Sequence, residues 1–307
     1  MPASVDASFR RYFRIQGDTS FIAMDAPPPH ENCRPFVRIA GYLLDMGLNA
    51  PKVIEADVER GFLLMSDLGP VQYLERIEQG SPDVPKLYTD ALHALSILQE
   101  KGAAVQSELP PYDADMLRFE LSLFIDWLCI AHLGLKLSAE EGRQWQSACD
   151  ALVASAVNQP QVFVHRDYHS RNLMVTEKDC PGIIDFQDAV EGPLTYDLVS
   201  LLKDCYVKWP GEKVRQGAMV FYQLSELAQQ RTPDAFTRDF DLMGMQRHLK
   251  ASGIFSRLLH RDGKPGFLKD VPRTLSYIVD AAPLYDDVKF VGEFVEERVL
   301  PALGEIN

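Results

Sequence analysis

The first 70 residues alternate between short apolar runs and one longer helical pattern. Apolar side chains recur at every second position or in compact runs, a pattern typical of strands. Strands are expected at residues 9–15, 20–26, 52–57 and 61–69. Residues 35–47 instead repeat apolar side chains at spacings of three and four, which predicts a helix that Gly47 can end.

Helical patterns dominate the chain after Gly69, and they are longer than those before it. Helices are expected at residues 85–102, 115–135 and 138–159, with several more after Leu198. Two short apolar runs, residues 161–167 and 182–188, interrupt them and read as strands. The chain is therefore expected to be an α+β protein, with a small β-rich N-terminal lobe (residues 1–68) and a large, mainly helical C-terminal lobe (residues 69–307).

Composition and charge limit the class of partner. Apolar residues make up 46% of the chain and the net charge is −13. Because nucleic acids and anionic membranes attract basic surfaces, neither is expected as the main partner. The five cysteines lack the close spacing of zinc or redox motifs, which favours free thiols in a reducing compartment. No signal peptide or membrane span is apparent, and we expect a cytoplasmic monomer.

The stretch "VHRDYHSRNLMV", residues 164–175, places an unusual density of polar side chains between two apolar runs. Packed strands on either side would hold these side chains on a fixed loop, as a reacting group requires. Asp167 and Asn172 are five residues apart, and Asp185 follows Asn172 after 13 residues. The spacing H-R-D-x-x-x-x-N, with a later aspartate, is the catalytic-loop and metal-aspartate pattern of protein kinases.

This pattern resembles the aminoglycoside phosphotransferase branch of the protein-kinase-like superfamily, which writes the loop as H-x-D-x-H-x-x-N. The resemblance implies a two-lobed protein-kinase-like fold, ATP as phosphate donor and Mg²⁺ as cofactor. It assigns the acceptor-aligning and proton-accepting role to Asp167. Asn172 and Asp185 offer Mg²⁺ the hard oxygen ligands that it prefers. The same resemblance gives structural support roles to His165, His169 and Asp197, the last of which is the aspartate of the family's Y-D-L element.

The nucleotide side of the resemblance is less complete. The run "LLMSDLG" matches the family's hinge, which predicts nucleotide contacts from Met65, Ser66, Asp67 and Leu68. The phosphate-covering hairpin lacks glycine, so Ser8 and its neighbouring backbone are expected to cover the phosphates instead. The strand that carries a phosphate-binding lysine in kinases has Met24 near that position. Another cation must then meet the phosphates, and Arg10 or Arg11 is the expected substitute.

The resemblance narrows further when the whole chain is considered. "DASFRRYFR", "IDFQDAVEGPLTYDLVSLL" and "QRHLKASGIFSRLLHRDGK" resemble the cell-wall amino-sugar kinases, which phosphorylate the anomeric hydroxyl of N-acetylmuramate and N-acetylglucosamine in peptidoglycan recycling. Glu120 and Trp127, seven residues apart on one expected helix, could supply a carboxylate and an aromatic plane to a sugar. The remaining acceptor-binding candidates are Arg171, Gln187 and Asp188.

Three other functions stay open from the sequence. The first is a kinase of another small alcohol, such as an aminoglycoside or a choline-like compound. The second is an inactive nucleotide-binding module, which the missing lysine favours and the retained Asp167, Asn172 and Asp185 oppose. The third is a structural or interaction protein that keeps only the fold, and no binding tail or repeat supports it.

Overall fold

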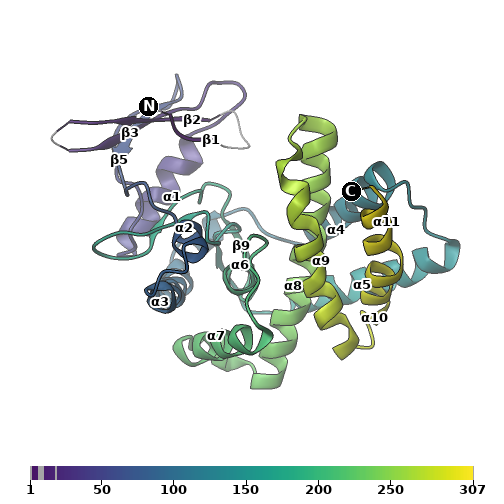
Figure 1. Ribbon diagram of the computed structural model, residues 1–307. Helices are drawn as coiled ribbons and strands as arrows, with labels where there is room; N and C mark the ends of the chain where they lie inside the picture. Colours follow the sequence, from purple (N-terminus) through teal and green to yellow (C-terminus); the bar gives the residue numbers. More distant parts are fainter. Residues whose placement is uncertain (1, 6–9, 18, 307) are drawn as a thin grey trace. The chain divides into compact units, whose positions relative to one another are not determined.

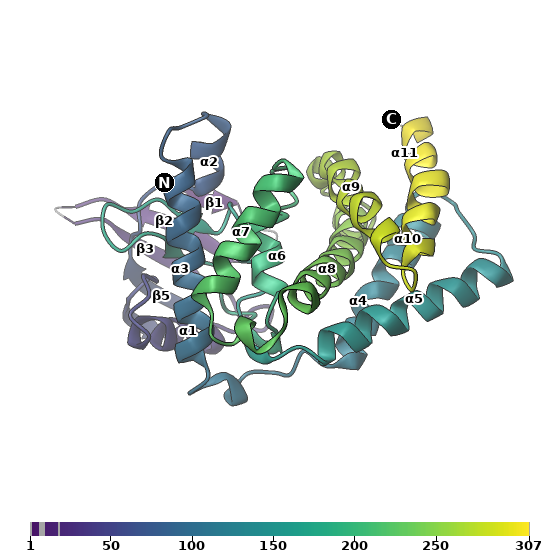
Figure 2. The same ribbon diagram turned by 90° about the horizontal axis from the view of Figure 1, so that it is seen from below.

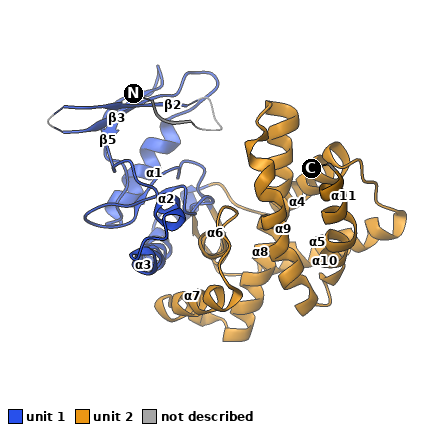
Figure 3. Ribbon diagram, in the orientation of Figure 1, with its two compact units in different colours: residues 1–109, 165–190 blue, residues 110–164, 191–307 orange. Residues whose placement is uncertain are grey.

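The computed structural model describes residues 2–5, 10–17 and 19–306. The chain divides into two compact units, residues 1–109 with 165–190 and residues 110–164 with 191–307 (Figure 3). The segment with the polar loop thus belongs to the same compact unit as the N-terminal sheet. These units do not follow the expected boundary after residue 68, which stays a prediction about functional lobes. The α+β class, with a small sheet and a mainly helical remainder, is confirmed.

Unit 1 contains a five-stranded antiparallel sheet with the order β1-β2-β3-β5-β4 (Figure 1). Its strands are β1 (Pro2–Val5), β2 (Arg11–Ile15), β3 (Phe21–Asp25), β4 (Val53–Asp57) and β5 (Phe62–Ser66). The alternation expected for β2 is confirmed: Tyr12 and Arg14 are partly buried, whereas Phe13 and Ile15 are exposed. The more polar face of this strand is therefore the one turned to the interior, where Arg14 meets Asp67.

The remaining elements of unit 1 connect this sheet to the polar loop. They are α1 (Arg34–Asp45), α2 (Tyr73–Glu78), α3 (Val84–Gly102), η1 (Gln106–Glu108), β7 (Leu173–Met174) and β8 (Gly182–Ile183). Helix α1 is followed by Gly47 at φ +82°, as the sequence predicted. Gly61 makes the β4–β5 turn at φ +78°, and a Cβ there would lie 2.0 Å from the carbonyl oxygen of Ala26. A side chain at that turn would therefore displace the chain that follows β3.

Unit 2 is mainly helical, and its centre is the 30-residue helix α8 (Pro233–Asp262). Helices α4, α5, α6 and α9 all pack on α8 (Figures 1 and 2). The other elements are α4 (Ala114–Leu123), η2 (Phe124–His132), α5 (Ala139–Val157), β6 (Gln161–Val164), β9 (Val190–Pro193), α6 (Tyr196–Leu202), α7 (Gly211–Leu224), η3 (Ala228–Gln230), η4 (Pro265–Asp270), α9 (Val271–Ala281), η5 (Ala282–Leu284), α10 (Lys289–Phe294), η6 (Val295–Val299) and α11 (Leu300–Ile306). Half of the buried residues of α8 carry apolar side chains, eight of sixteen, so this helix supplies much of the unit's core.

The single helix expected over residues 115–135 is instead two helical segments of different geometry. The α-helical hydrogen bonding of α4 gives way to a π-helix, η2, at Phe124. Helix α8 approaches this junction through Gly253, where a Cβ would lie 2.4 Å from both the carbonyl carbon and the oxygen of Leu123. Only a residue without a Cβ permits this contact, so Gly253 and the π segment belong to one packing arrangement.

All five cysteines are free, as expected from their spacing, and four of them are buried. No helix in the described ranges is long and apolar enough to cross a membrane.

Candidate active site

The hairpin of β7 and β8 brings Asn172 next to Asp185. Leu173 pairs with Ile183, and the Ile184 amide N–H donates to the Asn172 carbonyl at 3.1 Å. The two polar side chains therefore leave the same end of the hairpin, and the Asn172 Nδ2 donates to Asp185 Oδ2 at 3.1 Å. A gap of 13 residues in the sequence becomes a direct contact because the chain between them turns back on itself.

Asp185 has a positive φ of +64°, in the left-handed region that non-glycine residues rarely adopt. Its Oδ1 accepts a hydrogen bond from Gln187 Nε2 at 2.9 Å, and the same amide donates to Asp188 at 3.3 Å. Gln187 is buried, whereas 35% of the Asp185 side chain is exposed. Gln187, a candidate for acceptor binding from the sequence, thus holds Asp185 in place from the buried side.

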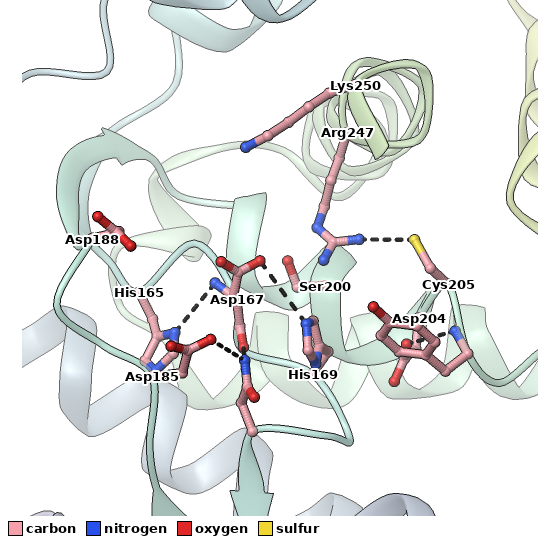
Figure 4. A network of polar contacts seen from close by, with 12 residues as sticks. His165, Asp167, His169, Asp185, Asp188, Ser200, Asp204, Cys205, Arg247 and Lys250 are labelled. Atoms are coloured by element: carbon pink, nitrogen blue, oxygen red, sulfur yellow. Dashed lines mark hydrogen bonds and ion pairs between the residues drawn. The ribbon is translucent and has the colours of Figure 1, made fainter. Parts of the chain in front are cut away.

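His165 shapes the loop from within the fold. Its Nε2 donates to the Ile184 carbonyl at 3.0 Å. Its Nδ1 accepts from the Asp167 amide N–H at 3.2 Å (Figure 4). One donating and one accepting nitrogen define a neutral imidazole. Burial lowers the pKa of His165 to about 4, so the ring is neutral at physiological pH. These contacts tie His165 to both ends of the loop, and its structural support role stays a prediction.

Asp167 presents its carboxylate on the loop that His165 fixes. The side chain is 47% exposed, and Oδ1 lies 3.9 Å from Nε2 of the buried His169. The Asp167 carbonyl accepts hydrogen bonds from the His169 amide and from Asn172 Nδ2, which close the loop on itself. The loop is also tied to α3, because the Tyr168 hydroxyl donates to the carbonyl of Ala91 at 2.9 Å. An accessible carboxylate is therefore held on a rigid turn.

The donor set around Asp185 suits a magnesium ion. Asn172 Nδ2 is engaged by Asp167 and Asp185, which leaves the amide oxygen as the ligand that Asn172 can offer. The described residues contain no group of three or more His, Cys, Asp or Glu side chains that could bind a metal alone. Mg²⁺ is commonly bound by one or two protein oxygens together with substrate phosphates and water. Asn172 and Asp185 therefore fit Mg²⁺ that arrives with a nucleotide.

A cavity of about 270 Å³ lies within unit 1, between the sheet and the hairpin. The expected hinge residues Met65, Ser66, Asp67 and Leu68 all line it. Arg171, predicted to bind the acceptor, lines the same cavity, as do Asn172 and Asp185. The structure thus brings the hinge and the metal-ligand candidates together around one space, and it associates Arg171 with that space.

The carboxylate of Asp67 links the expected hinge to residues of the N-terminal sheet region through hydrogen bonds. It accepts hydrogen bonds from Arg14 Nε at 2.6 Å and Nη2 at 3.0 Å, from the Ser20 hydroxyl at 2.6 Å and from the Gly69 amide at 2.9 Å. Burial alone would raise the pKa of Asp67, but these hydrogen bonds outweigh it and lower the pKa. Because the side chain is engaged in this way, any nucleotide contact from Asp67 falls to its backbone.

Arg10 and Arg11 have different environments. Arg10 is 12% exposed; its Nε donates to Glu31 at 3.0 Å, and its Nη1 lies 4.0 Å from Asp185 Oδ1. Arg11 is 64% exposed and pairs with Asp25 on the neighbouring strand. Arg10 is therefore the arginine placed beside the metal-ligand candidate, whereas Arg11 lies at the surface. Ser8, the predicted phosphate-covering residue, falls outside the described residues.

Glu120, expected to face a sugar, is buried within unit 2 and 3% exposed. Its Oε1 lies 2.8 Å from Lys250 Nζ, and its Oε2 accepts hydrogen bonds from the Tyr112 hydroxyl and from Gln246. Lys250 also donates to the hydroxyl of Tyr196 at 2.9 Å. The contacts give Glu120 the role of neutralising a buried lysine, and its role in sugar binding stays a prediction.

Glu120 and Trp127 were expected on one face of a single α-helix, but they lie in two helical segments of different geometry. Trp127 lies in the π-helix η2, whose wider turns remove the α-helical period that places residues seven apart on one face. Trp127 is half-buried. Asp197 is fully buried at the start of α6, and its predicted bond to the catalytic loop stays a prediction.

Three residues in these clusters were missed by the sequence reasoning. Arg14 lies in an expected strand, Glu31 in the segment after three prolines and Lys250 in a run with several basic residues, and the sequence singled out none of them. The sequence around Arg14 did contain a local signal. Arg14 is the third arginine of an expected strand in which apolar and polar side chains alternate. Glu31 and Lys250 had no such signal, because each is defined by a partner more than 20 residues away.

Comparison with known families identifies the class of this protein. The chain matches the phosphotransferase enzyme family over residues 1–236, and it belongs to that family. Among solved structures, it is similar to choline kinase LicA from Streptococcus pneumoniae, with a TM-score of 0.60 and 11% identity over 88% of this chain and 89% of that one. It is also similar to the ADP-bound aminoglycoside phosphotransferase APH(2'')-Ib, with a TM-score of 0.56 and 17% identity over 87% of this chain and 92% of that one. These likenesses confirm the kinase-like fold.

Curated relatives are much closer in sequence. The chain is 48% identical to the N-acetylmuramate/N-acetylglucosamine kinase of Pseudomonas aeruginosa, covering 96% of this chain and 87% of the relative. It is 39% identical to the N-acetylmuramate/N-acetylglucosamine kinase of Neisseria meningitidis, covering 92% and 87%. The resemblance to amino-sugar kinases that the sequence motifs indicated is confirmed.

Proposed function

We propose that this phosphotransferase is an ATP-dependent sugar kinase that phosphorylates the anomeric C1 hydroxyl of N-acetylmuramate and N-acetylglucosamine. Its products would be the α-1-phosphates used in peptidoglycan recycling. The observation that carries the proposal is the identity of 48% to a kinase of these two sugars over 96% of the chain. The hairpin with Asp167, Asn172 and Asp185 supplies a site suited to phosphoryl transfer.

In this proposal the nucleotide occupies the cavity of unit 1. The adenine would meet the backbone of Asp67 and Leu68, since the Asp67 side chain is held by Arg14 and Ser20. Arg10 would meet the phosphates, and Glu31 would hold its guanidinium in position. This pair would replace the lysine–glutamate pair through which protein kinases hold ATP phosphates.

Asn172 and Asp185 would hold magnesium through the amide oxygen and the carboxylate. When bound, magnesium neutralises charge that develops on the transferred phosphoryl group. Gln187 would keep the Asp185 carboxylate aimed at that ion, because its amide fixes one of the two oxygens. Asp167 would align the C1 hydroxyl with the phosphate and accept its proton late in the transfer.

The test is a comparison of acceptors, with product identified by phosphorus NMR. N-acetylmuramate and N-acetylglucosamine are offered beside the 1-O-methyl glycoside of N-acetylglucosamine, which keeps the 6-hydroxyl and blocks C1. We expect turnover of both free sugars and none of the glycoside. Phosphorylation of the glycoside at the rate of the free sugar would contradict the anomeric assignment. Preferred turnover of choline or an aminoglycoside would contradict the sugar class.

A further inference from the structure

Two arginines of unit 1 lie on the same face of strand β2 but have different surroundings. Arg10 directly precedes the strand and Arg14 lies within it, and both are partly buried, as is Tyr12 between them. Four extended residues span roughly 13 Å, so the two guanidinium groups meet different parts of the unit. Arg10 lies beside Asp185 and the candidate metal site, whereas Arg14 reaches the hinge.

Arg14 is bound to the hinge at two residues. Its Nε and Nη2 donate to the two carboxylate oxygens of Asp67, and its Nη2 also donates to the carbonyl of Gly69 at 3.0 Å. The exposed fraction of the side chain is 24% for Arg14 and 6% for Asp67. A bidentate pair that is largely shielded from water has a well-defined geometry. The charge of Arg14 is therefore opposed by the hinge itself, and Arg14 is not placed to bind a phosphate.

The ion pair fixes one end of a short stretch of hinge backbone, and the sheet fixes the other. Gly69 is held through both of its backbone groups, because its N–H donates to Asp67 and its carbonyl accepts from Arg14. Ser66, on the other side, pairs with Phe21 in the sheet. The backbone of residues 67 and 68 is thus held at both ends, and both residues line the cavity of unit 1, as does Arg14.

We propose that Arg14 is a positioning residue for the base of the nucleotide, and this inference rests on the nucleotide site of the proposed function. Arg14 holds the backbone of Asp67 and Leu68 in the conformation that hydrogen-bonds the edge of the base, while Arg10 meets the phosphates. A segment that is held in its bound conformation beforehand loses less conformational entropy on binding, which raises affinity. The two arginines of one strand therefore serve opposite ends of the same ligand.

The experiment divides the nucleotide into two probes. Adenosine carries the base and ribose without phosphates, and magnesium tripolyphosphate carries the phosphates without the base. The affinity of each is measured by competition against ADP, which needs no acceptor sugar. Arg14→Gln should weaken adenosine roughly tenfold and leave tripolyphosphate within about twofold, the size expected for the loss of a charge-assisted contact that acts at one end only. Arg10→Ala should do the reverse.

Three further variants serve as controls. Arg11→Gln makes the same change on the opposite face of β2, where the side chain is 64% exposed, and it should leave both probes unaffected. Arg14→Lys keeps the charge and should show the same selective loss to a smaller extent, so the test does not depend on the stability of Arg14→Gln. Adding Asp67→Asn to Arg14→Gln should weaken adenosine little further, because the two side chains act as one pair.

The outcomes separate a positioning role from a purely structural one. An unchanged adenosine affinity in Arg14→Gln, or an equal loss of both probes, would overturn the inference, since the second result means that the ion pair stabilises the whole unit. A loss confined to tripolyphosphate would place Arg14 at the phosphates and would also overturn it. So would adenosine that fails to compete in the wild type. Selective loss of adenosine, in a protein that phosphorylates neither sugar, would refute the proposed acceptors and support the role of Arg14.

Discussion

Two carboxylates of this protein, Asp185 in unit 1 and Glu120 in unit 2, are both held by several hydrogen bonds yet differ in what holds them. Asp185 is contacted by two neutral amides, from Asn172 and Gln187, and 35% of its side chain is exposed. Glu120 is 3% exposed and contacts an ammonium group at 2.8 Å. Nη1 of Arg10 lies 4.0 Å from Asp185 Oδ1.

The carboxylate of Asp185 can therefore still bind a cation, whereas the charge of Glu120 is already neutralised by Lys250. Neutral donors orient a carboxylate and leave its charge available, whereas a direct ion pair in a buried place uses that charge for the fold. Asp185 is thus suited to a metal, and Glu120 to the stability of unit 2. The predictions that follow test each side of this contrast.

The largest effect is expected from Asp185→Asn, which removes the anionic ligand while keeping the shape. Phosphoryl transfer should be abolished at ordinary Mg²⁺ concentrations, and the thermal unfolding midpoint should change little, because asparagine keeps the shape of a side chain that is 35% exposed. The matched control is Asp179→Asn, the same change at another positive φ in the same hairpin, on its exposed turn. Near-normal activity of Asp185→Asn would end the metal assignment.

Asp167→Asn should lower kcat by about 10²- to 10⁴-fold, the usual contribution of a general base. The amide keeps the size of the side chain but cannot accept the acceptor's proton. Steady-state kinetics should show a much smaller change in either KM, because the hinge and Asp185 are unaltered. A kcat equal to that of the wild type would exclude both the alignment and the proton-accepting role.

On the other side of the contrast, Glu120→Gln should destabilise unit 2 by about 3–5 kcal/mol, because it leaves Lys250 buried without its counter-ion. Denaturant unfolding measures this loss. Glu140→Gln, which breaks an exposed pair with Arg143, should cost at most about 1 kcal/mol. The double change Glu120→Gln with Lys250→Met should regain part of the loss. Wild-type stability of Glu120→Gln would mean that its carboxylate is not needed by the fold.

The smallest effect distinguishes two adjacent arginines. Arg10→Ala should raise KM for ATP roughly tenfold, since a charge-assisted phosphate contact is lost. Arg11→Ala should leave it within about twofold, as expected for an exposed cation paired on the surface. Initial rates over a range of ATP concentrations decide between them, and Arg10→Lys should lie between Arg10→Ala and wild type. Equal effects of the two alanine variants would remove the distinction that the structure draws.

The parts of the fold that the sequence predicts well are those set by local pattern. The strands at residues 11–15 and 62–66 and the helix before Gly47 follow from periodicity and turn residues. The contact of Asn172 with Asp185 was also predictable. The spacing of 13 residues between them is that of the kinase pattern, in which both residues lie at the metal site. Local spacing carried these inferences without any knowledge of distant partners.

The remaining features depend on partners that the sequence does not place. The π segment at Phe124 has the composition of an ordinary helix, and its geometry reflects packing against α8. From its own helix Glu120 was expected to face a sugar, because nothing nearby in the sequence indicates its contact with Lys250. Arg10 and Arg11 are neighbours with identical side chains, and only the sheet decides which one is buried.

The close contact at Gly253 also has a consequence for how this sequence can diverge. A Cβ at this position would lie 2.4 Å from the backbone of Leu123, where α4 passes into the π segment. Any replacement of Gly253 must therefore be accompanied by a shift of α8 or by a change in the backbone where α4 passes into η2. Among related chains, the glycine and the additional residue of the π turn are expected to be inherited or lost together, as a pair of positions that covary across more than 100 residues of sequence.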